Sequence, residues 1–122
     1  MSHHLPRHLP HHNHVIAALI LAAASGCASA ELARIETAHQ TYHWGQYEHS
    51  LAIYEQLAAQ GNAEAAERAG YMLMLGADTY GARVPRNVAR ATKLLEQAAD
   101  AGRPHANFLL EMSGQADCSR QT

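Results

Sequence analysis

The stretch EQLAAQGNAEA, Glu55–Ala65, returns further along the chain as EQAADAGRPHA, Glu96–Ala106. The identical positions are Glu55 and Glu96, Gln56 and Gln97, Ala58 and Ala99, Gly61 and Gly102, and Ala65 and Ala106. Self-similarity at a fixed spacing of roughly 20 to 50 residues is typical of repeat architectures. We therefore predict that the chain contains copies of one structural unit, with Gly61 and Gly102 at the junctions.

Apolar residues around these stretches recur every three or four positions, and no segment alternates as a strand would, so an all-α fold is predicted. The five expected helices cover residues 31–43, 46–60, 63–75, 88–101 and 104–113. Gly61 and Gly102 stand where left-handed C-terminal caps are wanted, and Asn62 and Asn87 suit the N-caps of the helices that follow. Residues 76–86 hold two glycines and a proline and are expected to form a loop.

One face of each expected helix is apolar or small. The residues expected to face inward are Leu32, Ile35, Ala38, Tyr42, Tyr47, Ser50, Leu51, Tyr54, Leu57, Ala58, Ala65, Ala66, Ala69, Met72, Leu73, Val88, Ala91, Leu94, Leu95 and Ala98. Gly70 lies on the same face of the third helix, where it permits a close helix crossing. So many small inward residues are typical of antiparallel helix pairs that stack in a row.

The repeat resembles a known family. GNAEAAERAGYMLMLG, Gly61–Gly76, resembles the first helix of a Sel-one-like repeat, a relative of the tetratricopeptide repeat, and VPRNVARATKLLEQAADAG, Val84–Gly102, is similar to the remainder. GQYEHSLAIYEQLAAQG, Gly45–Gly61, looks like the second helix of a preceding unit. The chain departs from the family at Ala69, at Arg83 and by an insertion at residues 78–81. The resemblance implies a short α-solenoid and a scaffolding role within protein complexes.

The N-terminal segment, residues 1–30, differs in kind from the rest. A polar stretch with several histidines precedes VIAALILAAA, Val15–Ala24, an uninterrupted apolar run that predicts an export signal. Ala24–Cys27 resembles the bacterial lipobox, with alanine where leucine is usual, and this implies a lipid on Cys27. Ala28–Ala30 fits an ordinary cleavage site instead, which would release a soluble protein. Both alternatives place the mature protein in the bacterial envelope or outside the cell.

The expected organisation is a signal peptide over residues 1–27, a helical repeat domain over residues 28–113 and a flexible tail over residues 114–122. After cleavage Cys118 is the one thiol left to pair, so no internal disulfide is expected. It either bridges to another chain or stays unpaired. Beyond Cys27 there are eight basic and eleven acidic side chains, which gives no electrostatic case for nucleic-acid binding.

The chain has no activated serine or cysteine constellation, phosphate-binding glycine loop or placed carboxylate pair, so we expect no enzymatic activity and no cofactor. We predict instead an adaptor that binds a partner protein of the envelope. The candidate contact residues are Tyr47, Tyr54, Tyr80, Arg86, Arg90 and Lys93. The last three form a basic stripe that suits an acidic segment or anionic headgroups, unless it is merely a solvated face.

Two alternatives to the adaptor remain open at this point. Glu36, His39 and His43 share one helical stripe, and His49 can approach from the next helix, as in a small periplasmic metal-binding protein. Another histidine tract precedes the cleavage site, at His3, His4, His8, His11, His12 and His14. Alternatively, the incomplete terminal half-repeats stack end to end in a homo-oligomer.

Overall fold

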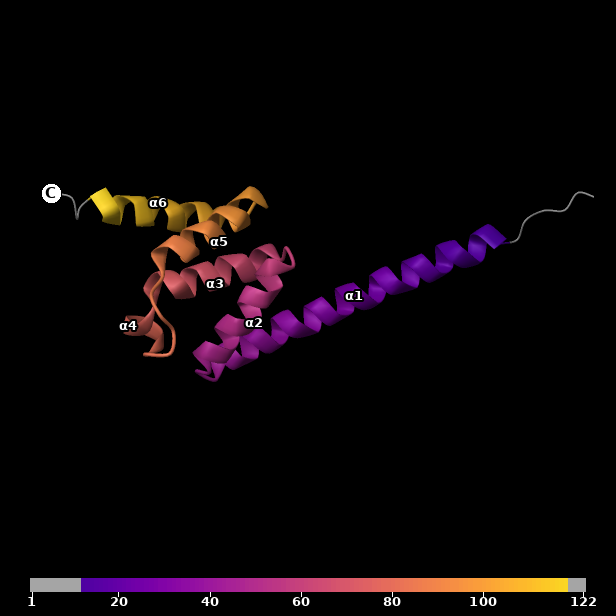
Figure 1. Cartoon of the computed structure of the whole chain (residues 1–122), viewed down its shortest axis with the longest axis horizontal. Coiled ribbons are helices and arrows are strands. Elements are labelled where there is room, and N and C mark those ends of the chain that lie inside the picture. Colours follow the sequence, from indigo (N-terminus) through magenta and orange to yellow (C-terminus); the bar gives the residue numbers. More distant parts are fainter. Residues whose placement is uncertain (1–11, 119–122) are drawn as a thin grey trace, which may run out of the picture. The chain divides into compact units, whose positions relative to one another are not determined.

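The structure is a computed structural model that describes the backbone of residues 12–118 and the side chains of residues 26–114. Its helices are α1 (His12–His43), α2 (Tyr47–Ala59), α3 (Ala63–Leu75), α4 (Ala77–Tyr80), α5 (Val88–Asp100) and α6 (Pro104–Cys118) (Figure 1). No strand occurs in residues 12–118, so the predicted all-α class is confirmed there. None of the described helices has both the length and the apolar character that crossing a membrane requires.

The chain divides into two compact units, residues 1–32 and residues 33–122. The described part of the first unit is a single helical run, residues 12–32 of α1. Alanine and leucine make up about half of this run, and both have high helix propensity. Helix α1 therefore begins at His12, well before the expected start at residue 31, and runs without a break to His43.

The two repeated stretches end their helices with the same backbone hydrogen bonds. The Asn62 amide donates to the Leu57 carbonyl at 3.0 Å, and the Arg103 amide donates to the Ala98 carbonyl at 3.0 Å. These six-to-one bonds define a Schellman cap, which places a left-handed glycine just before the donor. The predicted caps at Gly61 and Gly102 are confirmed, with φ of 93° and 87°.

The predicted N-caps are confirmed as well. The Asn62 side-chain oxygen accepts the Ala65 amide at 2.8 Å, and the Asn87 side-chain oxygen accepts the Arg90 amide at 3.0 Å. Each bond satisfies one of the amides that the first turn of a helix leaves without an intrahelical partner. Local chemistry therefore sets both starts, of α3 and of α5.

In the second unit, α3 packs against α2, α5 and α6, and α5 packs against α6 (Figure 1). Residues 33–43 of α1 are joined to α2, because the buried Ser50 hydroxyl donates to the Ala38 carbonyl at 2.8 Å. The crossing of α3 and α5 is close at Gly70, where a Cβ atom would lie 2.8 Å from Leu95 Cγ. The close crossing predicted at Gly70 is confirmed.

Among residues 26–114, the buried apolar residues belong to the second unit, and each of its helices contributes some of them. They are Ile35, Ala38, Leu51, Tyr54, Leu57, Ala58, Ala65, Ala66, Ala69, Met72, Leu73, Tyr80, Val84, Ala91, Leu95, Ala98, Ala106 and Leu109. The inward prediction is wrong for Leu32, which is 69% exposed. It is only partly correct for four residues whose side chains are half-buried, namely Tyr42, Tyr47, Val88 and Leu94. The α-helical period places these residues on the apolar face of their helix. A residue on this face is buried only where a neighbouring helix covers it.

Two boundaries differ from the expectation. The predicted loop, residues 76–86, contains the single helical turn α4, which the Gly81 amide closes on the Ala77 carbonyl at 2.9 Å. The segment ADTY includes no glycine or proline, so a turn of helix forms between Gly76 and Gly81. Helix α6 continues through Gly114 as far as Cys118, so the start of the expected tail is helical. A glycine inside a helix costs only about 1 kcal/mol and need not end it.

Candidate interaction surface

Tyr80 on α4 lies in an aromatic cluster with Tyr42 and Tyr47. Its hydroxyl is 3.1 Å from that of Tyr42, and its ring centre is 5.0 Å from that of Tyr47. Burial, followed by the hydrogen bond with Tyr42, raises the pKa of Tyr80 above the ordinary tyrosine value. Tyr80 is 8% exposed and covers helix ends, so it offers a partner little surface, while Tyr47 is half-buried beside it.

Tyr54 cannot anchor a partner. Its side chain is 1% exposed, and the same burial raises its pKa above the ordinary value. The prediction of a contact residue is wrong here because α2 and its neighbours enclose the ring completely. Helical spacing gave no means of separating an enclosed tyrosine from an accessible one, since both belong to the same stripe.

The three residues of the predicted basic stripe differ in the contacts that they make. Arg90 Nε lies 3.1 Å from Glu55 Oε1, so Arg90 is engaged in an ion pair with α2. Arg86 is exposed and its Nε donates to the Met74 carbonyl at 3.1 Å. Lys93 is exposed and forms no ion pair with any residue from 26 to 114. Arg86 and Lys93 therefore form no ion pair among residues 26–114, and both line the same hollow.

That hollow, called the α5 groove below, has a volume of about 790 Å³. It is lined by Met74, Leu75, Arg86, Val88, Ala89, Thr92, Lys93, Glu96, Met112 and Ser113. The lining comes from a stripe of α5, from Arg86 in the loop before it, and from the C-terminal parts of α3 and α6. A smaller hollow shares four of these residues and extends the groove toward Leu110 and Gly114. Sequence reasoning found the two cations but missed the apolar lining.

A second exposed feature, the α3–α6 stripe, consists of Tyr71, His105 and Phe108. The ring of His105 lies 6.4 Å from each of the other two ring centres and is stacked on Phe108 at 15°. Tyr71 is 37% exposed and Phe108 is 55% exposed. Met112, one helical turn beyond Phe108, is 50% exposed and also lines the α5 groove, so the stripe and the groove are adjacent.

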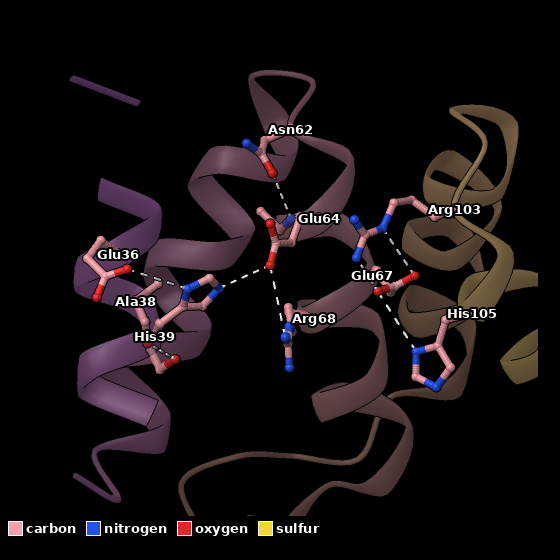
Figure 2. Close-up of polar contacts among 11 residues, drawn as sticks. Glu36, Ala38, His39, Asn62, Glu64, Glu67, Arg68, Arg103 and His105 are labelled. Carbon is pink, nitrogen blue, oxygen red and sulfur yellow. Dashed lines mark hydrogen bonds and ion pairs between the residues drawn. The ribbon is translucent and has the colours of Figure 1, made fainter. Parts of the chain in front are cut away.

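A buried ion pair fixes the start of α6 against α3 (Figure 2). Glu67 is 5% exposed, and Arg103 binds both of its carboxylate oxygens, at 2.7 and 3.3 Å. Burial by itself would raise the pKa of Glu67, but the hydrogen bonds and charge of Arg103 outweigh it and lower that pKa. His105 Nδ1 lies 3.8 Å from the same carboxylate, on its other side. The contact thus positions the stripe residue His105.

The proposed metal ligands do not assemble. His39 Nε2 lies 3.2 Å from Glu64 of α3, and His39 Nδ1 lies 4.0 Å from Glu36 (Figure 2). Among residues 26–114, no three histidine, cysteine, aspartate or glutamate side chains are placed to hold a metal ion. The alternative ligand set, Glu36, His39, His43 and His49, is thus not assembled in the described part of the chain. The N-terminal histidines and the Cys118 side chain lie outside the described side chains, whereas Cys27 is exposed on α1.

No protein-family model matches the chain, and neither a curated protein nor a solved structure matches it. The resemblance to Sel-one-like repeats therefore stays a prediction from the residues quoted above.

Proposed function

We propose that the protein is a non-catalytic adaptor of the bacterial cell envelope, built as a short stack of Sel-one-like helix pairs that binds a partner protein. The observation that carries this proposal is the α3–α6 stripe. It exposes two large aromatic rings beside the half-exposed Met112. Exposed apolar side chains that gather in one place are typical of protein interaction sites, whereas scattered ones are ordinary.

The repeat places large apolar side chains at equivalent positions along this surface. At the spacing that superposes Gly61 on Gly102, Tyr71 corresponds to Met112, so equivalent positions of successive units present large apolar side chains. A row of equivalent positions suits a partner segment that runs along several units, as helical repeat proteins commonly bind their partners.

The ion pair between Glu67 and Arg103 supports the same proposal. A carboxylate that is bound at both oxygens by a guanidinium has little freedom to move, and it holds α6 in place against α3. A surface that is already ordered loses less conformational entropy when a partner binds. The two helices that carry the stripe are therefore preorganised for association.

We also propose that Cys27 carries a lipid and tethers the protein to a membrane of the envelope, with release as a soluble protein as the alternative. The proposal rests on the lipobox resemblance of Ala24–Cys27. Replacement Cys27→Ser tests it: the wild-type protein should gain the mass of a lipid and sediment with membranes, and the variant should do neither. If neither form carried a lipid, the tether would be excluded.

The adaptor role is tested with a photo-crosslinking amino acid in living cells. Placed at Phe108, it should yield a discrete crosslinked species, and placed at the exposed Ala52 on α2 it should not. Phe108→Glu should abolish co-purification of the crosslinked protein while leaving the helical circular dichroism unchanged. Failure to obtain any species at position 108, or the same species at both positions, would contradict the proposal.

A further inference from the structure

The α5 groove combines an apolar lining with two cations that form no ion pair among residues 26–114. Lys93 has no acidic partner there, and Arg86 donates to a backbone carbonyl. Glu96 is the one carboxylate in the described lining of the groove. The groove is thus net positive on a chain whose formal net charge is −2. Its charge is a local feature that favours a negatively charged occupant.

The lining also favours an occupant with an apolar face. Met74 and Leu75 come from α3, Val88 comes from α5, and Met112 comes from α6. Methionine side chains are flexible and polarisable, and they adapt to differently shaped apolar partners. The cations come from α5 and the loop before it, so an occupant that packs its apolar residues on this lining would need acids beside Arg86 and Lys93.

The shape points to a helix rather than an extended strand. Residues 12–118 form no strand, so the described part of the chain has no sheet edge to which an extended segment can add. The groove is lined by a stripe of α5 together with residues of α3 and α6. An α-helix fits such a valley between helices by placing a ridge of side chains into it. Its volume of about 790 Å³ leaves room for several side chains.

We propose that the α5 groove binds an amphipathic helix of the partner protein, with apolar residues against Met74, Val88 and Met112 and acidic residues against Arg86 and Lys93. This inference rests on the proposed adaptor function and adds the chemistry of the partner segment. The stripe next to the groove extends the contact, because Met112 belongs to the lining and Phe108 lies one turn before it.

The chain contains its own reporters for a test. Of the four methionines, Met74 and Met112 line the groove, whereas Met72 is 1% exposed in the core. The full chain with ¹³C-labelled methionine methyl groups would be titrated with a designed helical peptide of about 15 residues. The peptide carries leucines at helical spacing on one face and glutamates beside them. We expect the methyl resonances of Met74 and Met112 to shift and that of Met72 to stay.

Charge is tested with a second peptide, in which lysine replaces every glutamate, and with two protein variants. The lysine peptide should bind at least about tenfold more weakly. Lys93→Glu should lower the affinity for the glutamate peptide by about tenfold, since the like charges then repel each other. Arg83→Glu makes the same charge change at a residue that is 84% exposed outside the groove, and it should leave the affinity unchanged.

Two results would overturn the groove inference. One is an absence of shifts at Met74 and Met112 with the glutamate peptide, and the other is equal affinity for the glutamate and lysine peptides. The adaptor role is judged separately, by the crosslink at position 108 in cells. The crosslink could form, and persist in Lys93→Glu, while the methyl resonances of Met74 and Met112 do not shift. The adaptor function would then be supported and the groove inference overturned. If the methyl groups respond as expected but no crosslink forms, the adaptor fails instead.

Discussion

Gly61 ends α2 with φ of 93°, and a Cβ atom at this position would meet no other atom within 4 Å. The cost of a side chain here is therefore purely conformational, because residues with a Cβ atom avoid left-handed backbone. Gly102 adopts nearly the same conformation at the end of α5, with φ of 87°. The recurrence of the glycine is thus explained by the turn rather than by packing.

For Gly61→Ala we expect a loss of about 1 to 2 kcal/mol in the free energy of unfolding. Gly114→Ala is the matched control, since Gly114 has open space, lies inside α6 and has no positive φ. There alanine should stabilise the protein by up to about 1 kcal/mol. Urea unfolding of both variants measures the two changes. Equal effects of the same sign would show that the left-handed cap is unimportant.

Glu67 is the buried acid whose ionisation matters for stability. Its folded-state pKa lies below the ordinary value of 4.5, so the ionised form stabilises the fold fully above that pH. The stabilisation is lost as the pH falls through the lower, folded-state pKa. For Glu67→Gln near pH 7 we expect a loss of about 1 to 2 kcal/mol, because two charge-assisted hydrogen bonds from Arg103 are weakened.

The difference between wild type and Glu67→Gln should therefore shrink as the pH is lowered from about 5 to about 3. Chemical denaturation at several pH values measures it. The control is Glu111→Gln, at an exposed residue with no ion pair among residues 26–114, which should change stability by less than about 0.5 kcal/mol. A gap between Glu67→Gln and wild type that is independent of pH would contradict the assignment.

At the scale of elements, the helix ends follow from short-range chemistry, and the sequence predicted them well. Asn62 and Asn87 cap the starts of α3 and α5, and each contact involves residues only three positions apart. The helical turn α4 was not predicted, because a segment of four residues is too short to show a periodic pattern. Tertiary contacts hold it, namely those of Tyr80 with Tyr42 and Tyr47.

The packing of α3 against α5 depends on the missing side chain of Gly70. A Cβ atom there would lie 2.8 Å from Leu95 Cγ and 3.2 Å from the Ala91 carbonyl oxygen. Gly70→Ala should therefore destabilise the protein by about 1 to 3 kcal/mol through overpacking. In a double-mutant cycle with Leu95→Ala, the double variant should lose less than the sum of the single losses, since the clash is relieved. Full additivity, measured by urea unfolding, would exclude the close contact.

At the scale of the whole molecule, α6 carries polar residues at the positions where α3 carries small ones. At the repeat spacing Gly70 of α3 corresponds to Glu111 of α6, and Ala66 corresponds to Asn107. Glu111 and Asn107 are both exposed. A carboxylate on the face where α3 receives the next helix prevents an equally close approach, as a polar capping unit of a repeat array does.

We therefore expect the chain to be monomeric rather than to continue end to end through α6. Size-exclusion chromatography with light scattering, on the uncleaved 122-residue chain without lipid, should give a mass near 13.2 kDa. A dimer that grows with concentration and is disrupted by Glu111→Arg would contradict this expectation and favour the homo-oligomer.

Helix class, the left-handed glycine caps, both asparagine caps and the close crossing at Gly70 were all predictable from the sequence, because each depends on neighbours in the chain or on the absence of one side chain. Exposure was not predictable in this way. Tyr54, Tyr71 and Phe108 occupy similar helical patterns, yet the first is enclosed and the other two are accessible. The neighbouring helices decide which stripe is covered, and they also bring Met74, Lys93 and Met112 from three separate helices to one groove.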